Sequence, residues 1–255
     1  MKSKPHNLFP ILWLTTLIMS CDNRPEHNQQ VNQLYITEKG DSVETGPWIF
    51  EPGVSGVSKR GNFKDGFRDG IWKYRHKGDS TAVNWIVFAK DSIKLNLPGG
   101  VNFTEQEIPV LFLARLRDDS EHSYYTLLRY NLKEVRASVY DYIFQYIQSL
   151  ENSSLEKLAK REVKKFNFKK TEVFRVKVDL RGQRNYQAIS YIFTSGDILY
   201  DLTFREELDK ITEIDLEVFS DMLYSFQASD FDPFNFNNKR YTTEENVDVR
   251  TPLQN

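Results

Sequence analysis

The stretch Tyr191-Ile-Phe-Thr-Ser-Gly196-Asp-Ile-Leu-Tyr200-Asp-Leu-Thr-Phe204 decides the fold of the second half of the chain. Apolar and polar residues alternate on both sides of Ser195-Gly196-Asp197, and a period of two interrupted by turn-forming residues is typical of antiparallel strands joined by a hairpin. The same alternation runs from Phe174 to Leu180, just before Gly182. These residues therefore predict a three-stranded antiparallel meander.

Helical periodicity flanks the meander. Apolar residues recur at spacings of three and four from Val139 to Leu150 and again from Asp209 to Phe226, which predicts two amphipathic helices. Between the first helix and the meander, Ser153-Ser-Leu-Glu156 offers a capping box for a second, short helix carrying Leu155, Leu158 and Ala159. Further strands are predicted at residues 83–87, 93–97, 108–116 and 124–130. This order predicts the α+β class, with an antiparallel sheet covered by helices.

Three segments of this region resemble the PsbP-like fold, an αβα sandwich. They are Asn84-Trp85 with Ile93 to Pro98, the hairpin from Tyr191 to Phe204, and the closing segment from Phe219 to Phe226. The resemblance covers the predicted domain at residues 81–228 and concerns pattern and order. It implies a domain used for binding and assembly. Residues 229–255 have no periodicity and are expected to be extended or disordered.

Residues 34–80 contain a short repeat. Gly46-Pro-Trp48-Ile-Phe50 recurs as Gly70-Ile-Trp72-Lys-Tyr74, and the intervening Asp65-Gly66 and Asp69-Gly70 supply the positive φ that tight hairpin turns require. The pattern resembles MORN-type repeats, which implies short β-hairpins. Trp48, Trp72 and Tyr74 are candidate ligand-stacking residues, although we prefer the interpretation that the tryptophans pack as core.

The N-terminus has the order of a secretory signal. Lys2 and Lys4 precede an uncharged apolar run from Leu8 to Met19, too short for a spanning helix. Leu17-Ile-Met-Ser-Cys21 resembles a bacterial lipobox, which implies that residues 1–20 are removed and that Cys21 is acylated. We expect residues 21–33 to tether an exported protein to a membrane, at the periplasmic face or the cell surface. The alternative is a plain signal peptide with an incidental cysteine.

Composition and motifs argue against several functions. A formal net charge of −2 gives no general attraction to nucleic acid. No nucleophile elbow, phosphate-binding loop or zinc-protease motif is present, so we predict no catalytic residue, no cofactor and no metal site. Asp118, Asp119, Glu121 and His122 lack regular ligand spacing, and we interpret them as a solvated loop.

A cationic segment is the other candidate binding region. Seven cations lie between Lys157 and Lys170, and the predicted binding residues among them are Lys160, Arg161, Lys164 and Lys165. They could contact an anionic surface such as phospholipid head groups or a charged glycan. We prefer the alternative that they form the solvated face of a helix and the loop after it.

The sequence thus predicts a non-enzymatic lipoprotein that acts as a binding or assembly module in the cell envelope. Its expected partners are the membrane, through lipid on Cys21, and another envelope protein. One alternative is an envelope hydrolase acting on glycan or peptide, which requires a deep cleft with converging carboxylates or a metal. Another is an antitoxin-like or immunity lipoprotein, suggested by the MORN-type resemblance.

Overall fold

The computed structural model of the chain describes residues 32–36, 42–105, 109–116, 122–168, 171–229, 231, 233–234 and 243–249. The predicted signal peptide, the lipidation site at Cys21 and nearly all of the tether lie outside the described residues, as does most of the segment 229–255. Residues Val31–Asn255 form one compact unit. Within the described part of the chain, no helix is long and apolar enough to cross a membrane.

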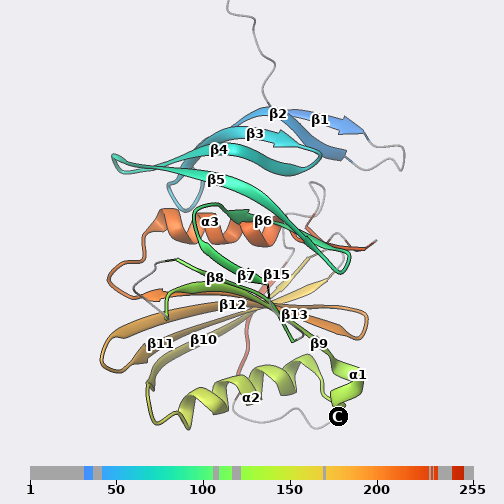
Figure 1. Cartoon of the computed structure of the whole chain (residues 1–255). Helices are drawn as coiled ribbons and strands as arrows, with labels where there is room; N and C mark the ends of the chain where they lie inside the picture. The colour runs from blue at the N-terminus through green and yellow to red at the C-terminus, as the bar shows by residue number, and fades with distance from the viewer. Residues whose placement is uncertain are drawn as a thin grey trace, which may run out of the picture. The chain divides into compact units, whose positions relative to one another are not determined.

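The first of two antiparallel sheets has seven strands in the order β1-β2-β3-β4-β5-β6-β14 (Figure 1). Its bounds are β1 Gln33–Ile36, β2 Ser42–Phe50, β3 Ser58–Lys64, β4 Phe67–His76, β5 Asp79–Lys90, β6 Ile93–Pro98 and β14 Gln227–Ala228. Six strands follow one another along the chain, whereas β14 comes from the far end and pairs with β6. The first sheet is therefore completed by residues more than a hundred positions away.

The second sheet has eight strands in the order β15-β10-β11-β12-β13-β9-β8-β7. Its bounds are β7 Asn102–Glu105, β8 Val110–Arg115, β9 Tyr124–Asn131, β10 Lys157–Asn167, β11 Glu172–Arg181, β12 Asn185–Ser195, β13 Ile198–Glu207 and β15 Thr243–Asn246. The strands β11, β12 and β13 are the predicted meander, which the observed pairing confirms. Gly196, with a φ of 58°, lies in the turn between the last two.

Two helices lie on opposite faces of the second sheet (Figure 1). Both predicted amphipathic helices are confirmed, as α2 (Val139–Glu151) and α3 (Glu213–Tyr224). Each begins with a capping box, formed by Ser138 with Asp141 and by Thr212 with Asp215. A single turn, α1 (Leu132–Val135), precedes α2. The helix α3 lies between the two sheets, so both of its sides are covered.

The predicted α+β class is wrong. Of the described residues, 59% are in strands and 15% in helices, and they form two antiparallel sheets rather than one sheet covered by helices. One cause of the wrong class is the short helix predicted after Ser153, a region that forms a strand instead. The Ser153 hydroxyl accepts hydrogen bonds from the backbone N–H groups of Leu155 and Glu156, both at 3.3 Å, but this turn leads into the strand β10. Pairing with β11 along most of its length outweighs the local helical signal.

The predicted hairpins of residues 34–80 form a continuous sheet. Asp65 and Gly66, with φ angles of 53° and 80°, make the two-residue turn between β3 and β4, as primed hairpin turns require. Gly70 also has a positive φ of 61°, but the prediction of a second turn there is wrong. It lies within β4, opposite the register shift between Arg60 and Asn62, so its conformational freedom serves a bulge.

Two apolar clusters make up the core. The larger one fills the space between the sheets around α3 and includes Trp48 and Trp72 of the first sheet with Phe112 and Phe219. The smaller one lies between the second sheet and α2, which contributes the buried Ile143 and Ile147. Because the first cluster joins aromatic residues from both sheets, the repeat region and the rest of the fold share one core.

Candidate interaction surface

The side of the first sheet that faces away from α3 carries the candidate site. Side chains of a strand point alternately to opposite faces, so the aromatic residues of β2, β3 and β4 face the core while their neighbours face outward. We call the outward-facing group Ile49, Arg60, Ile71, Lys73 and Arg75 the outer face. Pairing places Ile49, Arg60 and Lys73 directly beside one another on three adjacent strands.

The inward residues hold this face rigid. Phe63 packs edge to face on Trp48 and Trp72, with ring centroids 5.6 and 4.9 Å apart. The Trp72 ring also covers Gly61, where an added Cβ would lie 2.3 Å from the ring carbon Cδ2. The indole N–H of Trp72 donates to the Asn62 carbonyl at 2.9 Å. A packed aromatic layer therefore supports the outer face from below.

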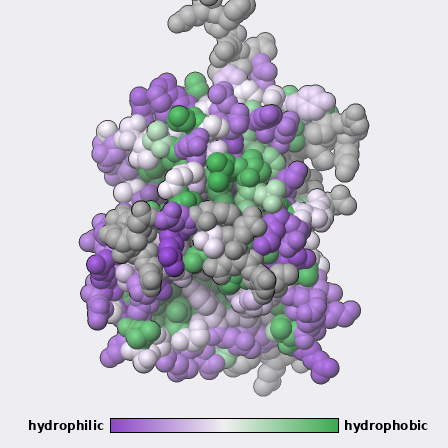
Figure 2. Space-filling model, in the orientation of Figure 1, coloured by the Kyte–Doolittle hydropathy of each residue, from purple (hydrophilic) through white to green (hydrophobic). Residues whose placement is uncertain are grey.

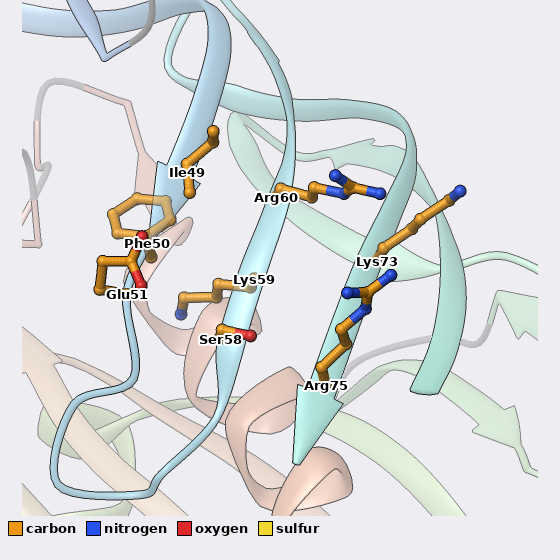
Figure 3. Close-up of a pocket in the computed structure, with 8 residues that line it drawn as sticks. All are labelled: Ile49, Phe50, Glu51, Ser58, Lys59, Arg60, Lys73 and Arg75. Carbon is orange, nitrogen blue, oxygen red and sulfur yellow. The ribbon is translucent and has the colours of Figure 1, made fainter. Parts of the chain in front are cut away.

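The outer face combines exposed isoleucines with cations. Ile49 and Ile71 are 45% and 63% exposed, and Arg60, Lys73 and Arg75 form no ion pair with any described residue. Figure 3 shows the charged ends of Arg60 and Lys73 on the opposite side of the strands from the Lys59 ammonium. The side chains in that view line a hollow of about 120 Å³, and a second hollow of about 340 Å³, lined also by Pro47 and Ile71, shares Ile49, Arg60 and Lys73 with it.

The cations of the outer face lower the stability of the isolated protein. Arg60 and Lys73 are direct cross-strand neighbours, and like charges in that position are destabilising. Exposed apolar side chains next to unpaired cations suit a partner surface that carries both apolar groups and acids. On the side of the molecule drawn in Figure 2, hydrophobic side chains gather at the level of the first sheet with hydrophilic ones around them.

A buried ionic network attaches the first sheet to α3. Asp221 of α3 is 1% exposed and contacts Lys59 Nζ at 2.5 Å, Arg68 Nη2 at 2.6 Å and the Tyr74 hydroxyl at 2.8 Å. Burial alone would raise the pKa of Asp221, but the charges of Arg68 and Lys59 hold it below its usual value. Burial, followed by the charge of Asp221, raises the pKa of Tyr74 well above its usual value. Asp221 is therefore the ionised centre of the contact.

A larger cleft of about 700 Å³ lies between the two sheets beside α3. Its lining includes Glu51, Glu213, Glu217 and Glu244, the kind of carboxylate group that the hydrolase alternative requires. Glu217 is paired with Lys59 at 2.6 Å and Glu244 with Lys164 at 2.5 Å. The described residues contain no group of three or more His, Cys, Asp or Glu residues that could hold a metal ion.

The three aromatic candidates from the sequence lie in the core. Trp48, Trp72 and Tyr74 are buried on the inner face of the first sheet, where they touch other side chains of this protein. The packing interpretation of the tryptophans is thus confirmed by their burial. Their contribution to the candidate site is structural, because they support the outer face.

The cationic candidates occupy the strand β10, so the helix-face interpretation is wrong. Alternation separates them: Lys160 and Lys164 point to one face of the second sheet, and Arg161 and Lys165 to the other. Arg161 pairs with Glu151 at 2.6 Å, Lys164 with Glu244, and Lys165 with Glu172 and Glu245 at 3.5 Å each. The segment is therefore not one continuous cationic surface.

The remaining acidic candidates, Asp118, Asp119 and Glu121, lie outside the described residues. His122 is exposed and its ring lies 5.6 Å from that of Tyr186.

The outer face is not among the sites predicted from the sequence. A signal was present in Gly70-Ile-Trp-Lys-Tyr-Arg75, where Ile71, Lys73 and Arg75 alternate with buried aromatic residues. It gave no indication that Arg60 lies opposite Lys73, because that contact depends on the register around a bulge.

Comparisons with known proteins identify distant structural similarity. No family model and no curated protein matches the chain. The solution structure of cyanobacterial PsbP from Synechocystis covers 57% of this chain and 92% of its own, with 11% identity and a TM-score of 0.42. A protein of unknown function from Pseudomonas aeruginosa covers 58% of this chain and 90% of its own, with 11% identity and a TM-score of 0.31. Similarity at this level carries no statement about function.

Proposed function

We propose that this protein is a membrane-anchored lipoprotein that acts as a non-enzymatic binding module of the cell envelope. In this proposal the outer face docks on another envelope protein whose surface presents acidic and apolar side chains. The lipid is attached to Cys21, and residues 21–33 are the tether that gives the fold its reach from the membrane.

The observation that carries the proposal is the pattern of the outer face. Three cations without a partner among the described residues lie on a rigid sheet, two of them, Arg60 and Lys73, between the exposed Ile49 and Ile71 and the third, Arg75, beyond Lys73. Arginine is enriched at protein interfaces, and cations without internal partners raise the rate at which an acidic partner associates. An apolar group beside each charge adds contact area that water exclusion makes favourable.

Affinity capture from detergent-solubilised envelopes tests the proposal. The lipidated protein is compared with Cys21→Ala and with the outer-face variant Arg60→Glu/Lys73→Glu, and the recovered proteins are identified by mass spectrometry. We expect one partner at a stoichiometric level with the wild type, and its loss with the outer-face variant. Recovery of the same partner from both would contradict docking through the outer face.

The matched control is Lys157→Glu/Lys160→Glu. These two residues are exposed on β10, form no ion pair with a described residue and undergo the same change of charge. We expect this variant to retain the partner. If it loses the partner while the outer-face variant keeps it, the binding surface is the cationic strand β10 rather than the outer face.

The other two functions stay predictions. A hydrolase would use the carboxylates of the cleft, and an immunity lipoprotein would be encoded beside a toxin. The hydrolase alternative uses the cleft, so it does not predict loss of a partner with the outer-face variant. The immunity alternative predicts that the recovered partner is that toxin.

A further inference from the structure

The cleft beside α3 has the dimensions and the walls of a groove for an extended chain. Its floor is the second sheet, where Lys164 and Phe166 of β10 and the following Phe168 point into it at every second position. Val173 and Arg175 of β11 lie next to them, as direct partners of Phe166 and Lys164. The floor thus has a charged end, where Lys164 pairs with Arg175, and an apolar end with Phe166, Val173 and Phe168.

One wall of the cleft is α3 and the other is the segment joining β2 to β3. From α3, Glu213, Glu217, Ser220 and Tyr224 face the cleft, at the spacings of three and four that define one side of a helix. The opposite wall contains Glu51 and Val54, both exposed. On the floor, Phe166 and Phe168 are each 8% exposed, whereas Val54, Glu51 and Glu213 are exposed on the walls.

The cations of the cleft are neutralised from within. Lys59 is held by Glu217 and Asp221, Lys164 by Glu244 and Arg175 by Glu162, at distances of 2.5 to 2.7 Å. The Arg175 guanidinium also lies 5.4 Å from the Phe166 ring centroid.

The acids at the mouth of the cleft differ from these cations in their pairing. Glu51 and Glu213 form no ion pair with any residue that the structure describes. Because every cation of the lining already has a carboxylate, these two acids are the charges left for a ligand to meet.

The length of the cleft sets the size of that ligand. From Lys164 to Phe168 the floor extends about 13 Å, at about 3.3 Å per residue. From Glu213 to Tyr224 the helical wall extends about 16 Å, at about 1.5 Å per residue. An extended peptide of about four or five residues has the same length.

We propose that this cleft binds a short extended segment of a partner protein in which apolar side chains alternate with lysine or arginine. The apolar side chains enter toward Phe166 and Phe168, and the basic ones reach Glu51 and Glu213 at the mouth. The inference uses other unpaired charges than docking through the outer face, and of its two acids Glu51 also lines the smaller hollow there whereas Glu213 does not.

Calorimetric titration with two matched peptides tests this. The protein is the chain from residue 21 with Cys21→Ala, because Val31–Asn255 forms one compact unit. The probes are acetyl-Phe-Lys-Val-Lys-Phe-amide and acetyl-Phe-Glu-Val-Glu-Phe-amide, at low ionic strength. We expect saturable one-site binding of the lysine peptide, about tenfold tighter than any binding of the glutamate peptide. Equal affinities, or no saturable binding of the lysine peptide, would overturn the proposal.

Charge reversal at the mouth locates the site. Glu51→Lys/Glu213→Lys should weaken the lysine peptide and strengthen the glutamate peptide, so that the preference reverses. Glu51→Lys alone, in a segment outside any strand or helix, should also weaken the lysine peptide and strengthen the glutamate peptide, to a smaller extent and without a change to α3. The control Asp197→Lys/Asp209→Lys changes two exposed acids outside the cleft by the same charge and should leave the preference unchanged. An equal effect of the control would assign the preference to overall charge and overturn the proposal.

The outer-face variant Arg60→Glu/Lys73→Glu should bind the lysine peptide as the wild type does. Failure of envelope capture with intact peptide binding then contradicts only the docking proposal, and the reverse result contradicts only the cleft.

Discussion

Lys59 and Asp221 join the two halves of the fold through a contact of 2.5 Å between Nζ and Oδ1, although 162 positions separate them in the chain. Lys59 lies on β3 of the first sheet and Asp221 on α3, and both are largely buried. A buried pair of this kind is costly to break, because the remaining charge stays in a medium of low polarity.

Asp221→Asn should therefore destabilise the protein by about 3 to 5 kcal/mol, the usual cost of removing one partner of a buried ion pair. The change leaves Arg68 without its carboxylate and Lys59 with Glu217 only. Urea unfolding at neutral pH measures the loss. The comparison is Glu217→Gln, which leaves Lys59 paired to Asp221 and should cost less than about 1 kcal/mol. Equal losses would show that Asp221 is not the centre of the network.

Asp201 should make the stability of the protein depend on pH in the direction opposite to Asp221, whose pKa is lowered in the folded state. It is 2% exposed and accepts hydrogen bonds from Tyr142 and Thr203, and burial raises its pKa. A raised pKa in the folded state means that the folded protein binds the proton more tightly, so this group lowers the stability as pH rises through its folded pKa. Asp201→Asn should remove that loss and be at least as stable as the wild type at neutral pH. Unfolding curves of both proteins between acidic and neutral pH provide the measurement, and a variant that is less stable at every pH would contradict it.

Gly61→Ala should destabilise the first sheet by about 1 to 3 kcal/mol, as overpacking of a rigid core does. The added Cβ would lie 2.3 to 2.5 Å from three atoms of the Trp72 ring, which is fully buried and cannot move aside. Gly53→Ala is the control, since nothing lies within 4 Å of its Cβ position, and it should change stability by less than about 0.5 kcal/mol. Thermal unfolding followed by circular dichroism compares the two, and equal melting temperatures would refute the close contact.

Arg60→Glu should raise the stability of the protein slightly while it weakens binding of the envelope partner. The new carboxylate would face Lys73 across the strands and replace a repulsion by an attraction, which is worth about 0.2 to 1 kcal/mol. We expect a slightly more stable protein that recovers less of its envelope partner. A variant that loses stability and partner together would indicate that Arg60 is needed for the fold.

Elements that depend on interactions between residues close in the sequence could be predicted, whereas those that depend on pairing between distant segments could not. The meander and both long helices follow from local periodicity, and the capping residues Ser138 and Thr212 lie where each helix begins. The strand β10 was mistaken for a helix because Ser153 to Glu156 forms a local turn in either case, and only pairing with β11 decides the outcome. The class was wrong because the repeat region joins a full sheet over α3 instead of forming separate hairpins.

The sites were less accessible to sequence analysis. Asp221 interrupts the apolar side of α3 between Phe219 and Met222, a visible anomaly, but its partners Lys59 and Arg68 lie at the other end of the chain. The cleft likewise combines β10, α3 and the segment after β2, so no spacing within one segment marks it.

The place of β14 in the first sheet determines the order in which the protein can mature. Strands β1 to β6 end at Pro98, yet the sheet is closed only when Gln227 and Ala228 pair with Lys94 and Ile93. The helix that covers the same sheet, α3, precedes β14 by two residues. A chain that is synthesised or translocated from its N-terminus therefore exposes the aromatic inner face of the first sheet until its last quarter has emerged. Because exposed apolar surface favours aggregation, this interval is the one in which a chaperone is needed most.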